Sequence, residues 1–461
     1  AQSVAIIGGA RGTNEDAYAW SLFAQALGVT NVDAQLDDGL PASVFGYNQA
    51  TIDQAANATT VILLSPDLKE ELPILYLRLR DASEKKRSKL IEFAPKQTGI
   101  TRYAWKSVAY EPGNQVAVVA STLADATIAA QVAKGSVVVV VGRANLAEDD
   151  SFTMAALDAV MAAAPNATVL PVIRRGNVRG AIESGLVTGS TTSILRSAVA
   201  GKINCLILLG ADPIADVRDT ELARQAMAAV QHVIAIDTFA SSSSQRADVL
   251  LPAAAFGEKD GTTTNLEGRV TQLNRKVNVH GTARPDWMIA LELADYLGHD
   301  LGVGSVQEVH QQLVSKVAAF GDATRAALAI NPDGVLLRRS SGNVSAGSAP
   351  TVPDRPGFGY RLVVSRKLYD NGSNVAHSAS LAPLAPGSSL HMHPLDLDRL
   401  GAAVGAQVKV SSDRTSIVMP IVADESVTRG TVWAAWAQSG ANIGELIDSS
   451  RSVNDVKVET L

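Results

Sequence analysis

Acidic side chains at the ends of apolar runs are the first residues whose types and spacing could do chemistry. Gly210-Ala211-Asp212-Pro213 follows one apolar run, and Asp237 ends the next one. Carboxylates at the ends of neighbouring parallel strands are placed to accept hydrogen bonds from a ribose or a guanine edge. The same spacing also fits a structural alternative, in which Asp212 caps a helix that begins at Pro213. We take Gly210, Asp212, Pro213 and Asp237 as candidate cofactor-binding residues, with the helix cap as the alternative.

A glycine-rich turn near the amino terminus is the second candidate. The sequence GGARGT at residues 8–13 lies between a predicted strand and a predicted helix, where backbone N–H groups could bind a phosphate. Its spacing matches neither G-x-G-x-x-G nor G-x-x-x-x-G-K-[ST], so a plain strand-to-helix turn is favoured. Thr13 and Asp16 have the spacing of a capping box and predict a helix that ends at Gly28.

Three other groups of residues give weaker signals. His391-x-His393 would place two imidazoles on one face of a strand, but no third metal ligand is evident nearby, which favours surface histidines. Glu258 to Gly261 carries three ionisable groups that could move protons, yet a charged loop with glycine is typical of a solvated turn. The single cysteine, Cys205, cannot alone hold an iron–sulfur cluster or a structural zinc, and its apolar neighbours predict a small buried side chain. The residues therefore predict no catalytic group and no metal site.

The elements that must position these residues follow an α/β pattern. A length of 461 residues predicts about three domains. Short apolar runs alternate with amphipathic helices up to about residue 330, which is typical of a largely parallel sheet covered on both faces. Residues 62–67 (ILLSPD) and 207–212 (ILLGAD) form an internal repeat, which predicts two related lobes whose strands end at a shared crevice. The predicted strands are 4–7, 61–64, 90–93, 116–119, 137–141, 169–172, 203–209, 233–236 and 249–251, and two long helices are predicted at 287–297 and 306–328.

The carboxyl-terminal part has a different pattern. Residues 340–359 are rich in Ser, Gly and Pro and predict a linker. Short strands separated by turn residues follow, at 361–365, 407–411, 417–421 and 431–435, as expected for a small all-β barrel.

Composition excludes several classes of partner. The 40 basic and 46 acidic residues give a formal net charge of −6, and no basic run could track a nucleic-acid backbone, so we expect no nucleic acid. The longest apolar stretches are far shorter than the roughly 20 residues of a membrane-spanning helix, so direct membrane insertion is not expected. The sequence opens at Ala1 without an initiator Met, which predicts the downstream part of a longer protein.

One long motif resembles a known family. ADVLLPAAAFGEKDGTTTNLEGRV at residues 247–270 is similar to the A-D-V-x-L-P…E-x-x-G-x-x-x-N-x-E-G-R segment of the molybdopterin oxidoreductase superfamily. IGGARGTNED at 7–16, RRGNVRGA at 174–181 and the stretch 393–411 also resemble family segments. The resemblance implies an α/β protein with two related doubly wound lobes of mostly parallel sheets and a C-terminal double-psi-like β-barrel. The expected domains are 1–48 with 145–335 (a discontinuous α/β lobe), 49–144 (an inserted α/β lobe), 336–359 (linker) and 360–461 (a molybdopterin-dinucleotide-binding-like β-barrel).

Within the superfamily, RRGNVRGA and TVWAAWAQSGANIGELID at 431–448 look most like the large iron–sulfur subunit of bacterial NADH:quinone oxidoreductase, respiratory complex I. That resemblance implies a cofactor-less scaffold in the peripheral arm of a translocase that passes electrons from NADH to quinone. It places [2Fe–2S] and [4Fe–4S] clusters upstream of Ala1, and none in this chain. It also implies contacts with other peripheral-arm subunits on the cytoplasmic side of the bacterial inner membrane, and an inactive isolated fragment.

Departures from the catalytic members support this choice. Catalytic members hold one guanosine of the cofactor in each lobe; one half here keeps the four candidate residues above, whereas the other has Ser65, Leu68 and Ala94 in place of glycine, proline and an acid. Leaving the buried polar groups of a guanine unpaired costs roughly 1–3 kcal/mol each. Lys367 to Asp370 stands where many catalytic members place His and Trp over the pterin. The segment 36–57, where a molybdenum ligand would lie, has no thiol and offers only Asp37, Asp38, Ser43 and Asp53.

Two alternatives stay open at this point. One is a fragment of a catalytic molybdopterin oxidoreductase, similar to formate dehydrogenase. The other is a stand-alone nucleotide-binding module that uses the half-site at Gly210, Asp212 and Asp237.

Overall fold

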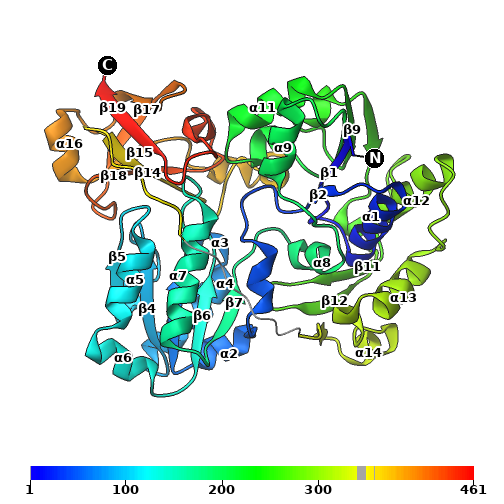
Figure 1. Cartoon of the computed structure of the whole chain (residues 1–461), viewed down its shortest axis with the longest axis horizontal. Coiled ribbons are helices and arrows are strands. Elements are labelled where there is room, and N and C mark those ends of the chain that lie inside the picture. Colours follow the sequence, from blue (N-terminus) through cyan, green and yellow to red (C-terminus); the bar gives the residue numbers. More distant parts are fainter. Residues whose placement is uncertain (1, 340–348, 358) are drawn as a thin grey trace. The chain divides into compact units, whose positions relative to one another are not determined.

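The computed structural model describes residues 2–339, 349–357 and 359–461, in two compact units (Figure 1). Unit 1 comprises Ala1–Gly39 and Ile173–Ser340, and unit 2 comprises Leu40–Val172 and Ser341–Leu461. Residues 340–348 and 358 of the predicted linker 336–359 lie outside the described residues.

Unit 1 is built on a five-stranded parallel sheet with the order β10-β9-β8-β1-β2. Its strands are apolar runs because both faces are covered. Helices α9 and α11 pack together on one face, and α1 contacts α12 and α13. The strands are β1 (Val4–Gly8), β2 (Asn31–Asp33), β8 (Cys205–Leu209), β9 (His232–Asp237) and β10 (Val249–Pro252), and the helices are α1 (Asn14–Leu27), α8 (Val178–Glu183), α9 (Thr191–Val199), α10 (Pro213–Asp216), α11 (Thr220–Ala229), α12 (Asp286–Tyr296), α13 (Val306–Lys316) and α14 (Arg325–Ile330).

The first helix of unit 1 begins and ends where the sequence predicts. The Thr13 side chain accepts from the Asp16 backbone N–H, the Asp16 side chain accepts from the Thr13 N–H, and Gly28 ends the helix with a φ of +65°. The single helix predicted over 306–328 is wrong, because a turn at Gly321 separates α13 from α14. Unit 1 also contains a small antiparallel sheet of β11 (Gly261–Thr264), β12 (Arg269–Leu273) and β13 (Val335–Leu336).

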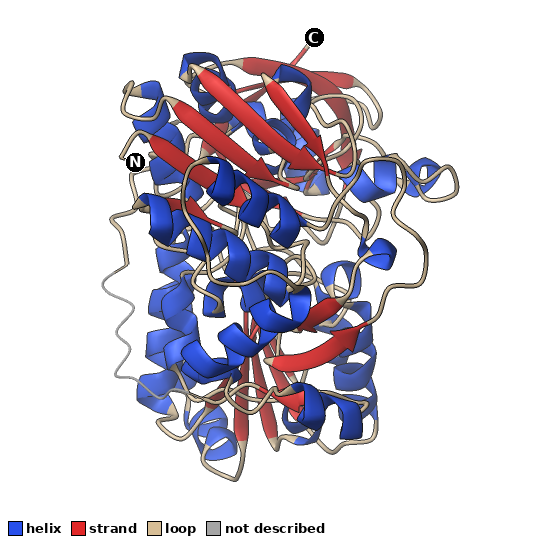
Figure 2. Ribbon diagram, turned by 90° about the vertical axis from the view of Figure 1, so that its right-hand side faces the viewer, coloured by secondary structure: helices blue, strands red, loops and turns tan. Residues whose placement is uncertain are grey.

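Unit 2 contains a second parallel sheet, with the order β5-β4-β3-β6-β7. Figure 2 shows strands in red with blue helices against them, and in Figure 1 helices α5 and α7 lie on one face of this sheet. The strands are β3 (Thr60–Leu64), β4 (Lys89–Ala94), β5 (Lys106–Ala109), β6 (Val137–Val141) and β7 (Thr168–Pro171), and the helices are α2 (Ile52–Asn57), α3 (Leu68–Glu71), α4 (Pro73–Glu84), α5 (Gln115–Leu123), α6 (Ala126–Val132) and α7 (Asp150–Ala163).

The two sheets have the same strand order once the repeated segments β8 and β3 are matched. β9 then corresponds to β4, β10 to β5, β1 to β6 and β2 to β7. The sheet of unit 2 extends beyond residue 144, the expected end of the inserted lobe, because β7 pairs in parallel with β6. The prediction of two related lobes with mostly parallel sheets is confirmed.

The strand predicted over residues 116–119 is wrong, because these residues belong to helix α5. Three valines in this run suggest a strand, but Val119 and Leu123 lie one helical turn apart and are both buried. Helix α5 packs against α7, and the strand position in the sheet is taken by the largely exposed β5. Tertiary packing therefore overrides the β-propensity of valine here.

Membrane-crossing capacity can be judged from helix length and hydropathy. Within the described part of the chain, no single helix is long and apolar enough to cross a membrane. Helices α5 and α6 meet these limits only as a pair, and this pair is bent by 82°.

The carboxyl-terminal barrel also belongs to unit 2. It is closed in the order β14-β18-β15-β17-β16-β19, and the pairs β14–β18 and β15–β17 are parallel among antiparallel neighbours. Leu146 and Ala147, from the loop after β6, complete the barrel core, so lobe and barrel share one apolar cluster. The elements are β14 (Gly359–Ser365), α15 (Ser373–Ala376), β15 (Leu390–Met392), α16 (Pro394–Leu400), β16 (Gln407–Ser411), β17 (Ser416–Ala423), β18 (Thr431–Ala435) and β19 (Asp455–Thr460).

Candidate functional site

The predicted half-site lies at the carboxyl ends of β8 and β9 in unit 1. Gly210 follows β8 with a φ of +55°, and Asp212 caps helix α10, which Pro213 begins. The buried Asp212 carboxylate accepts from the backbone N–H of Ser242 at 3.0 Å, and from the N–H and hydroxyl of Ser243 at 3.1 and 2.5 Å. These bonds tie the end of β8 to the loop after β9, as the helix-cap alternative expects.

Asp237 is placed differently from Asp212. It ends β9, half-buried, and its carboxylate accepts from the backbone N–H of Thr238 at 2.8 Å. Burial raises the pKa of this carboxyl group, and the nearby Arg11 partly opposes that effect. Gly210, Asp212, Pro213 and Asp237 are therefore brought together, while nucleotide binding by them stays a prediction.

The glycine-rich turn after β1 closes onto its neighbouring strand. Gly9 donates its N–H to the Leu209 carbonyl at 2.8 Å, and a Cβ on Gly8 would lie 2.3 Å from the same oxygen. Glycine is required at Gly8 because of this close approach and its φ of +112°. Beyond the turn, the Arg11 guanidinium donates to the Gly210 carbonyl at 2.9 Å and contacts Asp216 at 3.3 Å. The turn thus contacts the end of β8, which favours the plain strand-to-helix turn.

Arginines neutralise the two aspartates that follow β2. The guanidinium of Arg175 contacts both oxygens of Asp38, at 2.7 and 3.2 Å, and Arg174 lies 3.6 Å from the same carboxylate. Arg218 pairs with Asp37 at 2.7 Å. Asp38 has a side-chain exposure of 1% and Arg175 of 7%, so this pair is buried. Two of the carboxylates considered as metal ligands are therefore held by arginines.

The backbone of this arginine–aspartate cluster adopts an unusual conformation. Leu36, Asp37 and Arg175 have φ values of 57°, 62° and 72°, in the left-handed region that non-glycine residues rarely adopt. Such conformations persist where surrounding contacts over-determine them. No local pattern marks these arginines as partners of Asp37 and Asp38, although two of them lie in the RRGNVRGA motif.

The equivalent strand ends in unit 2 repeat part of this arrangement. Asp67 follows β3, accepts from the Lys69 N–H at 3.0 Å, and receives the Gly99 N–H at 3.1 Å on both of its oxygens. Burial raises the pKa of the Asp67 carboxyl group. Leu68 is buried, and Ala94 ends β4 without a carboxylate. The Asp67 bond to the loop after β4 corresponds to the Asp212 bonds to the loop after β9.

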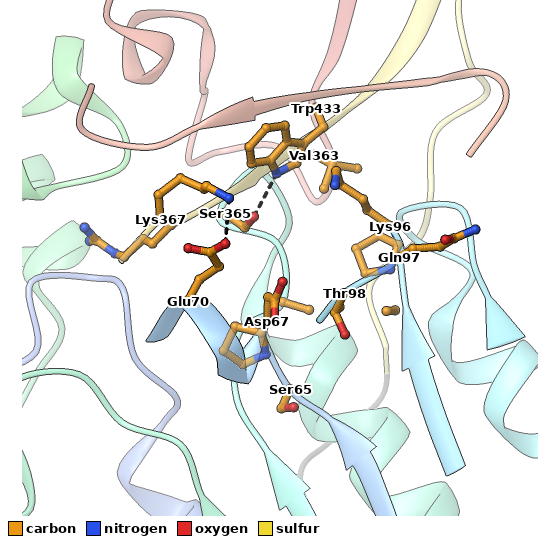
Figure 3. A pocket seen from close by; sticks show the side chains of 15 residues that line it. Ser65, Asp67, Glu70, Lys96, Gln97, Thr98, Val363, Ser365, Lys367 and Trp433 are labelled. Atoms are coloured by element: carbon orange, nitrogen blue, oxygen red, sulfur yellow. Dashed lines mark hydrogen bonds and ion pairs between the residues drawn. The ribbon is translucent and has the colours of Figure 1, made fainter. Parts of the chain in front are cut away.

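A small cavity of about 40 Å³ opens at these strand ends. It is lined by residues that follow β3, β4 and β6 and by barrel residues of β14 and β18 (Figure 3). Lys96 and Lys367 point toward the indole of Trp433, with their Nζ atoms 4.9 and 5.9 Å from the ring centroid. The segment 367–370 and Trp433, which lies in the motif 431–448, belong to stretches compared with the family, whereas nothing in the sequence marks Lys96, because no local pattern links residues so far apart in the chain.

The segments that carry the family resemblance meet in the interior of unit 1. The prediction that Lys259 lies in a solvated turn is wrong: it is buried, and its ammonium group lies 2.9 Å from Asp16 and 2.5 Å from Asp286. Burial lowers the pKa of Lys259, but the two carboxylates outweigh this and hold it above its ordinary value. A paired buried charge of this kind stabilises one arrangement of its elements and offers no free group for proton transfer.

Glu15 and Asn14 extend this buried polar cluster. Glu15 accepts from the N–H and hydroxyl of Thr262 at 2.7 and 2.8 Å, and lies 2.8 Å from Nδ1 of His310. Asn14 bonds the hydroxyls of Thr262 and Thr264. A Cβ on Gly180 would lie 1.9 Å from the Asn14 side-chain oxygen, which explains a glycine in RRGNVRGA. The motif residues therefore join α1 to α8, β11 and α13.

The two histidines of the pair have different partners. Nδ1 of His391 lies 2.9 Å from Asp424, whereas the His393 side chain accepts from the Leu395 N–H and caps α16. Among the residues that the structure describes, no group of three or more His, Cys, Asp or Glu side chains could hold a metal ion. Cys205 is half-buried at the start of β8, and burial raises the pKa of its thiol.

Comparison with known proteins identifies the family. A "Molybdopterin oxidoreductase" family model matches residues 1–296, and a "Molydopterin dinucleotide binding domain" model matches residues 360–458. The chain belongs to the molybdopterin oxidoreductase family. The resemblance inferred from the motifs is thereby confirmed.

Several relatives in the family are similar over most of this chain. It is 26% identical to the NADPH-Fe(3+) oxidoreductase subunit alpha of Geobacter sulfurreducens, covering 100% of this chain and 64% of that protein. It is also 26% identical to the G subunit of the NADH-quinone oxidoreductase of Mycobacterium tuberculosis, covering 95% of this chain and 57% of the relative. The chain thus spans about three-fifths of the length of these curated relatives.

A solved structure shares the fold. Acetylene hydratase from Pelobacter acetylenicus superimposes with a TM-score of 0.69 at 12% identity, covering 100% of this chain and 86% of that protein. This likeness confirms two lobes with mostly parallel sheets and a closed barrel as the architecture of the chain.

Two regions outside the half-site of Gly210, Asp212, Pro213 and Asp237 fit the cofactor of this family poorly. A molybdenum ligand from Asp37 or Asp38 would have to leave the arginines that bind it in unit 1. In unit 2, a guanine has no carboxylate at Ala94, and both oxygens of Asp67 already accept the Gly99 N–H. If Asp38 bound a cofactor instead, the buried guanidinium of Arg175 would lose its partner, which costs free energy.

Proposed function

We propose that this chain is a structural, cofactor-free part of the peripheral arm of a proton-translocating NADH:quinone oxidoreductase, which passes electrons from NADH to quinone. Similarity to the G subunit of an NADH-quinone oxidoreductase over 95% of the chain supports this assignment. The oxidoreductase role belongs to the assembly, and the isolated chain is expected to be inactive.

The observation that carries the proposal is the arginine–aspartate cluster of unit 1. The buried Asp38 and the half-buried Asp37 are two of the four candidate ligands for a metal, and each is matched by a guanidinium at 2.7 Å. A carboxylate in a bidentate pair with arginine is held as an anion with fixed geometry and is a poor exchangeable ligand. This favours a scaffold over a molybdenum enzyme.

The rest of the subunit supplies the redox groups in this proposal. Because the chain spans 57% of the NADH-quinone oxidoreductase relative, residues outside it have room for [2Fe–2S] and [4Fe–4S] clusters in a region preceding Ala1. The chain would contact other peripheral-arm subunits and lie on the cytoplasmic side of the bacterial inner membrane, without entering the bilayer. No part of the proposal requires nucleic acid.

Two other relatives suggest related oxidoreductase functions. The NADPH-Fe(3+) oxidoreductase subunit alpha is similar over the whole chain and also belongs to an assembly named for a reduced nicotinamide nucleotide. The F420-dependent formate dehydrogenase 1 subunit alpha of Methanococcus maripaludis is 24% identical over 53% of the chain, which gives the catalytic molybdopterin enzyme as second candidate.

Metal and pterin analysis separates scaffold from enzyme. The full chain is purified from cells supplied with molybdate and tungstate, its metals are measured by mass spectrometry, and pterin fluorescence is measured after denaturation. The scaffold predicts far less than one molybdenum, tungsten or iron per chain and no pterin release. A stoichiometric metal or a guanine-containing pterin would favour the formate dehydrogenase-like candidate instead.

Co-purification tests the assembly. A tagged full-length subunit is expected to recover other peripheral-arm subunits together with NADH:quinone reductase activity that the chain alone lacks. Recovery of iron(III) reductase activity without quinone reductase activity would contradict the complex I assignment and would support an assembly like the NADPH-Fe(3+) oxidoreductase.

A further inference from the structure

A second cavity, of about 160 Å³, lies within unit 1. Its wall is made by residues from the first turn of α1, the start of β11, the end of β12 and the amino-terminal parts of α13 and α14. Contacts of α13 with α1 and of α14 with β12 bring these elements together. The lining residues that the structure describes do not include Gly210, Asp212, Pro213 or Asp237, so this cavity is separate from the half-site.

The buried part of the wall, here called the floor, consists of Glu15, Thr262 and His310. The Glu15 carboxylate accepts from the N–H and hydroxyl of Thr262 and lies 2.8 Å from Nδ1 of His310, whose Nε2 lies 3.0 Å from the Ala323 carbonyl. A Cβ on Gly261 would lie 2.5 Å from the Glu15 carboxylate, so a glycine is needed where the floor meets β11. The floor is therefore polar and held in one arrangement by its own hydrogen bonds.

The side chains above the floor differ from it, because they have no partners. Within the described part of the chain, four lining side chains take part in no hydrogen bond or ion pair. They are those of Gln272, Asn274, Gln307 and Arg325. They come from the end of β12, from α13 and from α14, so three separate elements supply them. Three carboxamides and one guanidinium thus line the cavity with donors and acceptors that the protein itself does not use.

The charges of the wall balance. Both ring nitrogens of His310 face oxygen acceptors, so a hydrogen lies in each contact and the Glu15–His310 pair carries no net charge. Asp260 and Arg325, both exposed, add one charge of each sign at the opening. A charged ligand would therefore meet a group of like sign as well as one of opposite sign, and would gain little net attraction. This balance favours a neutral ligand.

The free groups of the wall match hydroxyl groups. A carboxamide accepts through its carbonyl oxygen and donates through its NH₂ group, and a hydroxyl group does both. Neighbouring hydroxyls of one molecule can therefore bond several carboxamides without leaving a donor or an acceptor unpaired. The volume is close to that of a cavity of about 150 Å³ that holds benzene, which limits the ligand to about six to ten non-hydrogen atoms.

We propose that this cavity binds a small neutral polyol through the carboxamides of Gln272, Asn274 and Gln307. Arg325 supplies a further donor at the opening, and the Glu15–His310 pair forms the floor beneath the ligand. The scaffold function does not use this site, so the failure of either proposal leaves the other intact.

Ligand-observed NMR on the full chain tests the site. Glycerol, erythritol and ribose are titrated in turn at millimolar concentrations, because concentrated polyols stabilise proteins through exclusion from the surface. Saturable binding of at least one polyol is expected, with a Kd on the order of 1–10 mM, as a few neutral hydrogen bonds support. Raising the salt concentration from about 50 to about 500 mM should leave this affinity unchanged, because salt screens only charges.

Two charged molecules of similar size serve as comparison. Lactate carries a carboxylate and one hydroxyl group, and glycine is a zwitterion. Each should bind at least about tenfold more weakly than the best polyol, because each leaves carboxamides of the wall without a hydroxyl partner.

Matched variants assign the binding to the cavity. Gln272→Ala and Gln307→Ala should each weaken polyol binding about threefold to tenfold, as expected for the loss of one hydrogen-bonding group. Gln225→Ala removes an exposed carboxamide from α11, outside the cavity, and should leave binding unchanged. In the parent chain, bound polyol should slow hydrogen exchange in residues 272–274 and 307–310.

Three results would overturn the proposal. They are the absence of saturable binding for all three polyols, unchanged affinity in both alanine variants at positions 272 and 307, and tighter binding of lactate or glycine than of every polyol. If a variant fails to fold by circular dichroism, hydrogen exchange of the parent chain decides instead. Protection of residues 272–274 and 307–310 by the polyol then supports the site, and its absence contradicts it.

Discussion

The ends of β8 in unit 1 and β3 in unit 2 share one construction. At each, an aspartate two residues after the first turn residue binds the loop that follows the next strand: Asp212 binds Ser242 and Ser243, and Asp67 binds Gly99. A glycine after the neighbouring strand also bonds the last carbonyl of this strand. Gly9 after β1 donates its N–H to the Leu209 carbonyl, and Gly142 after β6 donates to the Leu64 carbonyl, both at 2.8 Å. The aspartate is therefore a structural link between successive loops in both lobes.

The difference between the two lobes lies in what surrounds this shared link. Unit 1 has paired arginines and aspartates beyond its strand ends, with Asp38 and Arg175 buried. Unit 2 has a cavity with Lys96 and Lys367 beside an indole. Two lobes with the same backbone plan thus present a closed arginine–aspartate cluster in one case and a cavity bordered by lysine–carboxylate pairs in the other.

The largest effect is expected from breaking the ion-pair cluster of unit 1. Asp38→Asn should lower the free energy of unfolding by about 3–5 kcal/mol, because Arg175 is left as a buried charge without its partner. Asp53→Asn, which removes an exposed partner of Arg78, should cost about 1 kcal/mol or less. Urea unfolding with hydrogen exchange by mass spectrometry locates the loss, and equal effects of the two substitutions would contradict a buried cluster.

A pH effect is expected from unit 2, in the loop after β6. Burial raises the pKa of Glu148 to about 7, against 4.5 as its ordinary value, so the folded chain binds more protons than the unfolded chain in this range. Its contribution to stability is full below pH 4.5, falls by about 3 kcal/mol as the pH rises to 7, and is constant above.

Glu148→Gln tests this directly. The variant should lose that part of the pH dependence and should be more stable than the parent at pH 8, since it buries no charge. Unfolding free energies at pH 5, 6, 7 and 8 measure the slope, and identical slopes in parent and variant would refute the assignment to Glu148.

Removing the shared aspartate carboxylate should lower the free energy of unfolding in both lobes. Asp212→Asn and Asp67→Asn each turn an acceptor into an amide that faces backbone N–H donors, which costs roughly 1–3 kcal/mol. The loss should be larger for Asp212, whose exposed fraction is 4%, than for the half-buried Asp67. Asp333→Asn, at an exposed position, serves as control; a nucleotide-binding role without a structural one would leave stability unchanged at Asp212.

The smallest effect separates the two turn residues. Gly210 has a φ of +55° and open space where a Cβ would lie, so Gly210→Ala should cost about 1–2 kcal/mol from backbone strain alone. Ser65 has no such conformation, and Ser65→Ala, which removes one buried hydroxyl without straining the backbone, should change stability by about 1 kcal/mol or less. Thermal unfolding followed by circular dichroism compares them, and equal shifts would mean that the turns are conformationally alike.

Local sequence patterns predict most of the elements. The apolar runs of β3, β6 and β8 and the capping box of α1 act over a few residues, and they lie where the sequence indicates. The valine-rich run of α5 is predicted as a strand and is a helix. Over so short a stretch, the β-propensity of valine favours a strand, whereas the spacing of the buried residues fits a helix.

The candidate site is predicted only in part. The sequence locates Asp212 at a strand end and leaves its role between a nucleotide ligand and a helix cap; the structure shows the cap and adds the bonds to Ser242 and Ser243, 30 residues along the chain. Lys259 is expected in solvent because its local neighbours are charged, and its actual partners are Asp16 and Asp286.

By itself the sequence determined the family, the two related lobes, the barrel and the positions of the strand ends, because these follow from long motifs and from the period of apolar residues. Only the tertiary structure decided which acidic groups are bound internally and which basic groups line a cavity. Arg175 meets Asp38 and Lys367 meets Glu70 across 137 and 297 residues. An ion pair is fixed by distance in space, and no local pattern in the chain encodes that distance.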